Sequence, residues 1–150
     1  MQNYQDFDSL EELIPGCYSY KINPSIRCLK NSIIDTLITK LETNGHLLGR
    51  ICFHESHEDP IQSMIIALNH KYKVKKHIHR GVEIIKIIRG ELIITEHHKT
   101  TSNSFHLSNN NLLFCRMSKG VIHSVQSKKD WAIFMEIGTG PFDENTTLYV

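Results

Sequence analysis

From Arg50 onward the chain is a succession of short apolar runs, rich in Ile, Val, Phe and Leu, separated by clusters of turn-forming residues. Runs of this kind predict β-strands. We expect about nine of them, near residues 49–54, 61–68, 72–79, 83–88, 91–97, 105–107, 112–117, 121–126 and 131–137. Because so many short strands must protect their edges, the sequence predicts a mainly β protein, with a jelly roll as the natural closed arrangement.

The first 48 residues have a different pattern. Residues 17–22 predict a short strand, and apolar residues at a spacing near 3.6 predict a helix that Ser32 caps and Asn44-Gly45 ends. The helix face consists of Ile33, Ile34, Leu37, Ile38 and Leu41. Two capping-box patterns before Pro15-Gly16 predict one earlier helical turn, near residues 8–14. We therefore expect residues 1–48 to form a strand- and helix-bearing appendage, packed on a barrel of residues 49–150 in one structural domain.

Composition narrows the classes of protein further. A chain of 150 residues, 40% hydrophobic, can bury one core, and its net charge of +1 provides no sustained field for nucleic acid. We expect neither a membrane span nor a secretory signal, and hence a cytoplasmic protein. The four scattered cysteines predict reduced structural thiols, with redox chemistry as the alternative. Edge protection in a small barrel favours a homodimer.

Ten histidines are an unusual number for this length, and three of them stand in a meaningful pattern. His77 and His79 alternate on a predicted strand, so both imidazoles lie on one face. Glu83 follows a turn at Gly81 and opens the next strand. The sequence Gly120-Val121-Ile122-His123 places a third histidine at the start of a later strand. Three imidazoles and a carboxylate predict a site for one divalent transition metal ion per chain (Fe, Mn, Ni, Co or Zn), with positions left open for a substrate.

The same segment has a simpler interpretation. Residues 71–80 carry five lysines and arginines and one tyrosine besides the two histidines, as in a solvent-exposed basic strand or a phosphate-binding patch. The alternation of the histidines and the ordered spacing of Glu83, Gly90 and His123 favour the metal site. We keep the basic strand as the alternative.

At these positions the chain resembles the cupin superfamily. His77-x-His79-x3-Glu83-x6-Gly90 matches the spacing of the first cupin motif, and Gly120-x2-His123 matches the core of the second. The resemblance implies a cupin jelly-roll barrel in which these four side chains bind the metal. Ser118 stands where the second motif usually has proline, which affects the turn and none of the ligands.

A narrower resemblance, to the WbuC family of cupin-fold metalloproteins, covers most of the chain. It is carried by residues 50–56, 59–68, the HxHxxxE segment and 136–142, whereas Lys75-Lys76 depart from the expected Arg-Pro or similar pair. The resemblance implies a bacterial protein linked to O-antigen (lipopolysaccharide) biosynthesis. It also implies that Arg50 and His54 line the ligand cavity, although a core or edge role is equally compatible. Tyr72 is a further candidate for the cavity, with packing as the alternative.

Two functions fit these features. In the first, the metal assists isomerisation, epimerisation or oxygen chemistry on a small polar substrate, a sugar or nucleotide sugar, and no residue stands out as the catalytic base. In the second, the barrel is a non-catalytic module that senses or carries a small ligand or a metal. The sequence does not decide between an enzyme and a binding module.

Overall fold

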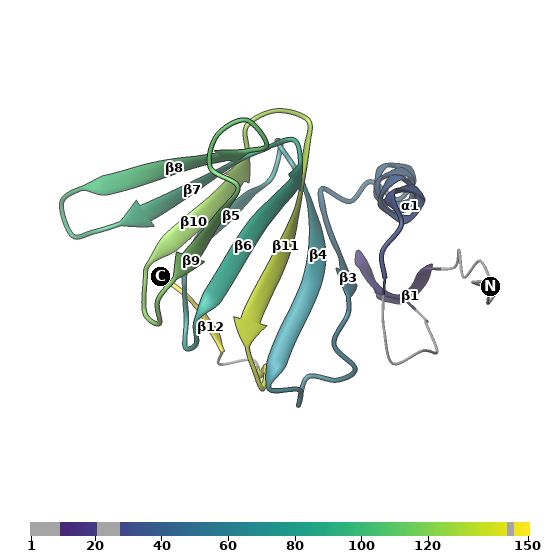
Figure 1. The fold of residues 1–150 in the computed structure, drawn as a ribbon, viewed down its shortest axis with the longest axis horizontal. Coiled ribbons are helices and arrows are strands. Elements are labelled where there is room, and N and C mark those ends of the chain that lie inside the picture. The colour runs from purple at the N-terminus through teal and green to yellow at the C-terminus, as the bar shows by residue number, and fades with distance from the viewer. Residues whose placement is uncertain (1–9, 21–27, 144–145) are drawn as a thin grey trace.

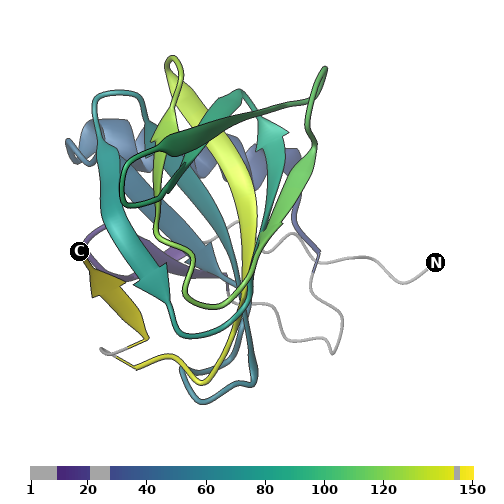
Figure 2. The same cartoon turned by 90° about the vertical axis from the view of Figure 1, so that its left-hand side faces the viewer.

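The computed structural model describes residues 10–20, 28–143 and 146–150. Two sheets face each other and close into a barrel, and one helix lies against the outside of the larger sheet (Figures 1 and 2). The larger sheet has the strand order β1-β2-β3-β4-β11-β6-β9, and the smaller has the order β12-β5-β10-β7-β8. This is the mainly β jelly roll that the sequence predicts.

The helix is α1 (Asn31–Thr43). The strands are β1 (Leu10–Ile14), β2 (Cys17–Tyr20), β3 (Leu48–Cys52), β4 (Ile61–Asn69), β5 (Lys73–His79), β6 (Glu83–Arg89), β7 (Glu91–His97), β8 (Ser102–Ser108), β9 (Phe114–Met117), β10 (His123–Ser127), β11 (Trp131–Thr139) and β12 (Thr147–Tyr149). β3 to β11 correspond to the nine predicted strands. β12 has no counterpart among the predictions.

The central strand β11 is buried on both faces. Ala132 and Phe134 point into the barrel, where they join the core between the two sheets. Ile133 and Met135 point outward and pack in a second core beneath α1. Since neighbouring strands pair residue by residue, side chains of β3, β4, β6 and β9 follow the same alternation. The inward-facing rows of this sheet form one wall of the barrel cavity.

Helix α1 covers the outer face of the larger sheet. Its buried residues are the apolar positions that the 3.6-residue spacing identifies: Ile33, Ile34, Leu37 and Leu41. Asn44 is the C-cap, and Gly45 follows with a φ of +71°, which favours glycine, so the predicted helix end is confirmed. The predicted cap Ser32 is wrong, because the helix begins earlier and Lys30 occupies the N-cap position.

The helical turn predicted near residues 8–14 is wrong. The segment before Pro15-Gly16 is strand β1 instead of a helical turn, because it pairs antiparallel with β2 through residues such as Leu10 and Glu12. β2 in turn pairs with β3, the only parallel pair among the named strands of the described residues. Residues 8, 9 and 21–22 of these predictions lie outside the described residues. The predicted boundary between the appendage of residues 1–48 and the barrel of residues 49–150 stays a prediction.

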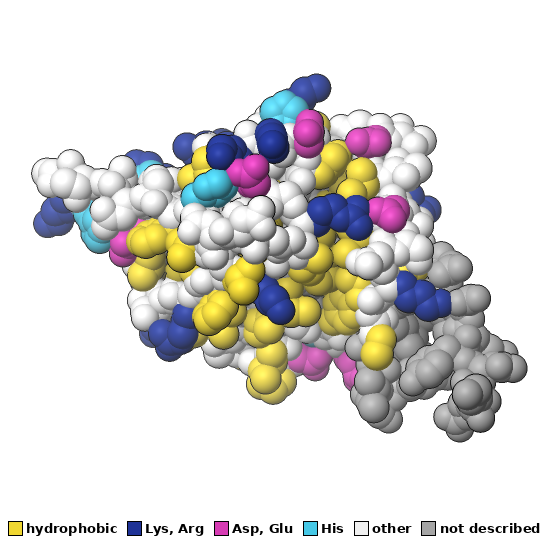
Figure 3. Space-filling view, turned by 45° about the horizontal axis from the view of Figure 1, so that its top comes forward, with side chains coloured by type: hydrophobic (Ala, Val, Ile, Leu, Met, Phe, Trp, Pro, Cys, Tyr) yellow, Lys and Arg dark blue, Asp and Glu magenta, His cyan; other side chains and the backbone are white. Residues whose placement is uncertain are grey.

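The surface carries mixed charge. On the face drawn in Figure 3, basic and acidic side chains are interspersed among hydrophobic and neutral ones. Within the described part of the chain, no helix has both the length and the apolar character required to cross a membrane.

Candidate metal centre

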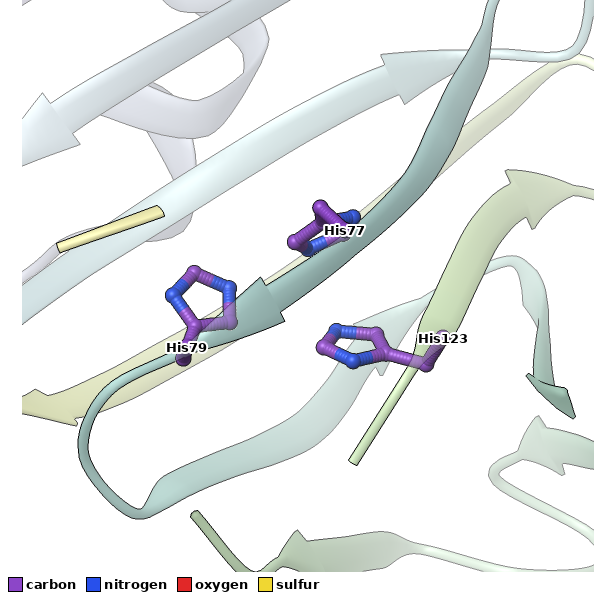
Figure 4. A group of neighbouring side chains, drawn as sticks. All are labelled: His77, His79 and His123. Atoms are coloured by element: carbon purple, nitrogen blue, oxygen red, sulfur yellow. The ribbon is translucent and has the colours of Figure 1, made fainter. Parts of the chain in front are cut away.

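Three strands bring the predicted ligands together. His77 and His79 lie at the end of β5, Glu83 begins β6, and His123 begins β10. β10 pairs antiparallel with β5, and His123 lies directly opposite His77. Because the register fixes this pairing, histidines 46 residues apart in sequence meet at the same end of the barrel. Figure 4 shows the three rings converging on one point.

Two glycines shape the turns around this group. Gly120 has a φ of +83° in the turn before β10, a conformation that side-chain-bearing residues rarely adopt. At Gly81, between His79 and Glu83, an added Cβ would lie 2.7 Å from the Cβ of Thr139. The tight turn at Gly81 therefore needs glycine because β11 passes so close to it.

The distances are short enough for one ion to contact all three rings. One nitrogen from each of His77, His79 and His123 lies within 4.8 Å of the other two. Glu83 completes the group, since its Oε2 is 3.3 Å from Nε2 of His79 and 3.2 Å from Nε2 of His123. His77, Glu83 and His123 are buried and His79 is half-buried. The structure thus brings all four predicted ligands together.

Each imidazole is oriented by a partner on its other nitrogen. Nδ1 of His77 donates to the backbone oxygen of Lys75 at 2.7 Å, and Nδ1 of His123 donates to that of Val121 at 3.1 Å. Nδ1 of His79 lies 3.2 Å from the hydroxyl oxygen of Thr147 on β12. A carbonyl can only accept, so Nε2 of His77 and His123 carries the free lone pair in the neutral ring. Such partners fix the tautomer and the orientation of metal-binding histidines.

The electrostatics favour neutral imidazoles at His77 and His79 and a charged carboxylate at Glu83. Burial lowers the pKa of His77 to about 4 and also lowers the pKa of His79. Burial opposes the charge of Glu83 as well, but the hydrogen bond from His123 and the nearby imidazoles outweigh it and lower its pKa. For His123, the hydrogen bond and charge of Glu83 outweigh burial and raise the pKa. Glu83 and His123 therefore form a buried charged pair in the metal-free protein.

The residues fit a bound metal ion. Nε2 of His123 and Oε2 of Glu83 are buried and lie 3.2 Å apart, and neither atom has a hydrogen-bond partner outside the four predicted ligands. These polar atoms are therefore turned toward the other predicted ligands, which is the arrangement that a shared metal ion requires. Three nitrogens and one carboxylate oxygen suit Fe, Mn, Ni, Co or Zn, as expected from the sequence. His77, His79 and His123 form a group that can hold such an ion.

A small cavity opens beside the group, with a volume of about 30 Å³, enough for about two water molecules. Its lining consists of Gln62, Met64, His79, Gly81, Val82, Glu83, Glu136, Gly138, Thr139, Phe142 and Thr146. A Cβ built on Gly138 meets nothing within 4 Å, so the absent side chain keeps this space open. His79 and Glu83 belong both to the cavity and to the predicted ligand set.

The sequence prediction missed Glu136. It lies on β11 two residues before Gly138, facing inward diagonally opposite Glu83, and its side chain shares a hydrogen bond with that carboxylate. Burial and the charge of Glu83 raise the pKa of Glu136 well above its ordinary value, although Arg50 opposes the shift. An acid in the inward-facing register of an otherwise apolar strand is the signal that could have identified it.

Arg50, His54 and Tyr72, the three predicted cavity residues, are not among the residues that line this cavity. Arg50 is half-buried on the inward face of β3, near enough to influence Glu136 electrostatically. His54 lies beyond the end of β3, where its Nδ1 is 3.0 Å from the backbone oxygen of Ser63. Tyr72 is 42% exposed and precedes β5, five residues before His77, so alternation does not place it beside the ligands.

Comparison with solved structures identifies the class of the fold. A cupin-like protein from Thermotoga maritima matches with a TM-score of 0.56 and 14% identity over 69% of this chain and 75% of that chain. A cupin superfamily protein from Desulfitobacterium hafniense matches with a TM-score of 0.52 and 16% identity, over 61% and 76%. Oxalate decarboxylase from Bacillus subtilis matches with a TM-score of 0.54 and 21% identity, over 62% and 24%. The protein has the cupin fold.

Sequence comparison gives the family. Residues 29–106 match the model described as a domain of unknown function, DUF6016, and the chain belongs to this family. The match covers the predicted ligands His77, His79 and Glu83, whereas His123 lies beyond it. No curated protein matches the sequence. The chain spans about a quarter of the oxalate decarboxylase chain that it matches.

Proposed function

We propose that this protein is a metal-dependent cupin that binds one divalent transition metal ion per chain through His77, His79, Glu83 and His123. The observation that carries the proposal is the convergence of three oriented imidazoles and a buried carboxylate oxygen. A divalent ion bound there would act as a Lewis acid on an oxygen of a small ligand. The four ligands would leave coordination positions open toward the cavity.

The cavity supports a small polar ligand. Glu136 is the one carboxyl in its lining besides Glu83, and Thr139 and Thr146 are the lining residues that carry hydroxyl groups. The volume of about 30 Å³ favours a few-atom ligand or the reacting end of a sugar over an enclosed nucleotide sugar. Glu136 is placed to hold or accept a proton from such a ligand. In the enzyme function, Glu136 would supply the acid–base group for isomerisation or epimerisation of a small sugar-like substrate.

Gln62 stabilises the rim of this cavity. Its buried side chain donates from Nε2 to the backbone oxygens of Ser56, His57 and Asp59 at 3.0 to 3.3 Å. The side-chain amide thus ties the loop between β3 and β4 to the start of β4. Gln62 is an organising residue, and its donor group is already engaged before any ligand enters.

The alternative is a non-catalytic module that senses or carries a small ligand or the metal. The narrowness of the cavity favours it, because a site of this size leaves little room for a reaction with two substrates. The role in O-antigen biosynthesis rests on the WbuC resemblance alone. We keep both functions within the proposal of a metal-binding cupin.

A cobalt titration tests the metal site. Co²⁺ added to chelator-treated protein should produce a visible absorption band that saturates at one equivalent, because nitrogen and oxygen ligands give Co²⁺ characteristic spectra. His79→Ala should lose the band, whereas His57→Ala, which changes a 71% exposed imidazole, should keep it. Equal titrations for wild type and His79→Ala would contradict the site.

A ligand panel then separates enzyme from binding module. Protein loaded separately with Fe, Mn, Co, Ni or Zn is incubated with free sugars and nucleotide sugars, and products are sought by mass spectrometry. New products that disappear in Glu136→Gln support the enzyme. Binding without turnover in every metal form supports the module.

We further propose a homodimer formed through the edge of the larger sheet. β9 is the last strand of that sheet, and near it Leu113 and Phe114 are 50% and 64% exposed. Burying such side chains against a second copy would protect the edge. Sedimentation analysis should give a dimer for wild type and a monomer for Phe114→Glu. A monomeric wild type would contradict this proposal.

A further inference from the structure

Two cysteines far apart in sequence meet at the junction of the N-terminal hairpin and the barrel. Cys17 begins β2 and Cys52 ends β3, and their sulfur atoms are 3.8 Å apart. The register explains the meeting, since Cys17 pairs with Arg50, which lies two residues before Cys52 on the same face of the strand. All four cysteines are free thiols.

The surroundings favour a thiolate on Cys17. The hydrogen bond from Cys52 lowers the pKa of Cys17 to about 6, and the positive charge of Arg50 acts in the same direction against burial. The same hydrogen bond, together with burial, raises the pKa of Cys52. The pair therefore favours a thiolate, the nucleophilic form of cysteine, on Cys17 and a thiol that can supply a proton on Cys52.

The other cysteines lack this arrangement. Cys115 is half-buried on β9, and burial raises its pKa to about 11, which keeps it protonated. Cys28 is an exposed free thiol. A cysteine reacts readily with oxidants when it has thiolate character and when a second thiol lies near enough to form a disulfide with it. Cys17 and Cys52 together meet both conditions.

We propose that Cys17 and Cys52 form a dithiol site that a hydroperoxide oxidises to a disulfide linking β2 to β3. With hydrogen peroxide, the Cys17 thiolate attacks one peroxide oxygen and the O–O bond breaks; the departing oxygen takes a proton from solvent, which gives water and a Cys17 sulfenic acid. The sulfur of Cys52 then attacks the Cys17 sulfur. The S–S bond forms as the S–O bond breaks, and hydroxide leaves with the Cys52 proton as a second water.

The geometry allows this bond with a limited shift. The sulfur atoms must approach by roughly 1.8 Å from their separation of 3.8 Å to reach a disulfide length. β2 is four residues long, and only β1 separates it from the open edge of the larger sheet. The disulfide would fasten the hairpin of β1 and β2 to β3 beside Arg50.

Trypsin separates the four cysteines, which makes the test direct. Cys17 falls in peptide 1–21, Cys28 in 28–30, Cys52 in 51–71 and Cys115 in 100–116. Reduced full-length protein is treated with one equivalent of hydrogen peroxide, alkylated with iodoacetamide and digested without reductant. We expect a species in which peptides 1–21 and 51–71 are joined with the loss of two hydrogen atoms. Peptides 28–30 and 100–116 should be alkylated.

Variants identify the attacking sulfur. Cys52→Ser should leave a sulfenic acid on Cys17 that dimedone traps, and Cys115→Ser should form the disulfide as wild type does. The proposal is overturned if peptides 1–21 and 51–71 are both recovered alkylated to the same extent as 100–116. It is also overturned if the first oxidation product joins Cys28 of two chains. The wild-type peptide map gives this answer whether or not a variant folds, and it is independent of the metal site.

Discussion

Acidification of the metal-free protein should reveal His77 as a buried neutral group. Burial holds the pKa of His77 at about 4, whereas the ordinary value is 6.5. As the pH falls below 6.5, the unfolded chain gains a proton at this residue before the folded chain does. His77 therefore contributes stability that is fully present above pH 6.5 and is lost as the pH falls toward 4.

The magnitude follows from the difference between the two pKa values. Each pKa unit corresponds to about 1.4 kcal/mol, so at pH 4 the loss from His77 is about 3 kcal/mol. The conversion is appropriate because only 4% of the residue is exposed. A loss of this size is a substantial part of the 5 to 15 kcal/mol that stabilises an ordinary domain.

The assay is urea unfolding at a series of pH values, with a chelator present throughout. His77→Phe keeps a ring of similar size that does not titrate, so wild type should lose about 3 kcal/mol more than this variant between pH 7 and pH 4. His57→Phe changes an exposed imidazole and should follow the wild-type profile. Parallel profiles for wild type and His77→Phe would refute the reasoning, because His77 would then titrate alike in both states.

Three further substitutions test the cavity, the ligand orientation and the second core. Gly138→Val should fill the open space beside Glu83 and block azide binding, while the affinity for Co²⁺ is kept. Azide binding is followed by the visible absorption of the Co²⁺ form, and undiminished binding would argue against this cavity. Thr147→Val removes the hydroxyl beside His79 and should weaken Co²⁺ binding by about 10- to 100-fold. Thr147→Ser should restore the wild-type Co²⁺ affinity. Equal Co²⁺ affinities for wild type, Thr147→Val and Thr147→Ser would contradict the orienting role of this hydroxyl. Leu37→Ala, at a fully buried position of α1, should cost about 2 to 5 kcal/mol in urea unfolding. The exposed Thr39→Ala should stay within about 0.5 kcal/mol of wild type, and equal stability of both variants would contradict the packing of the helix.

The sequence alone predicts most of the barrel because its strands carry their own signals. Alternation puts His77 and His79 on one face, and glycine turns place Glu83 and His123 at strand starts. The helix is equally visible, since its apolar spacing coincides with its buried face. These features are local in the chain, and local patterns suffice to predict them.

The missed features depend on contacts between distant segments. β1 contains the sequence LEELI, which suits a helical turn, and it is a strand because β2 pairs with it. β12 is three residues long, yet it lies beside β5 and brings Thr147 to His79. The register of β11 against β6 places Glu136 beside Glu83. Sequence patterns do not report which strands become neighbours.

The metal content of the purified protein tests the central claim most directly. Elemental analysis of wild type, with protein concentration from amino-acid analysis, should give close to one transition metal ion per chain. His123→Ala should contain none, and His57→Ala should match wild type. The account is contradicted if wild type contains no transition metal and takes none up when each of Fe, Mn, Co, Ni and Zn is supplied. It is equally contradicted if His123→Ala retains the full metal content.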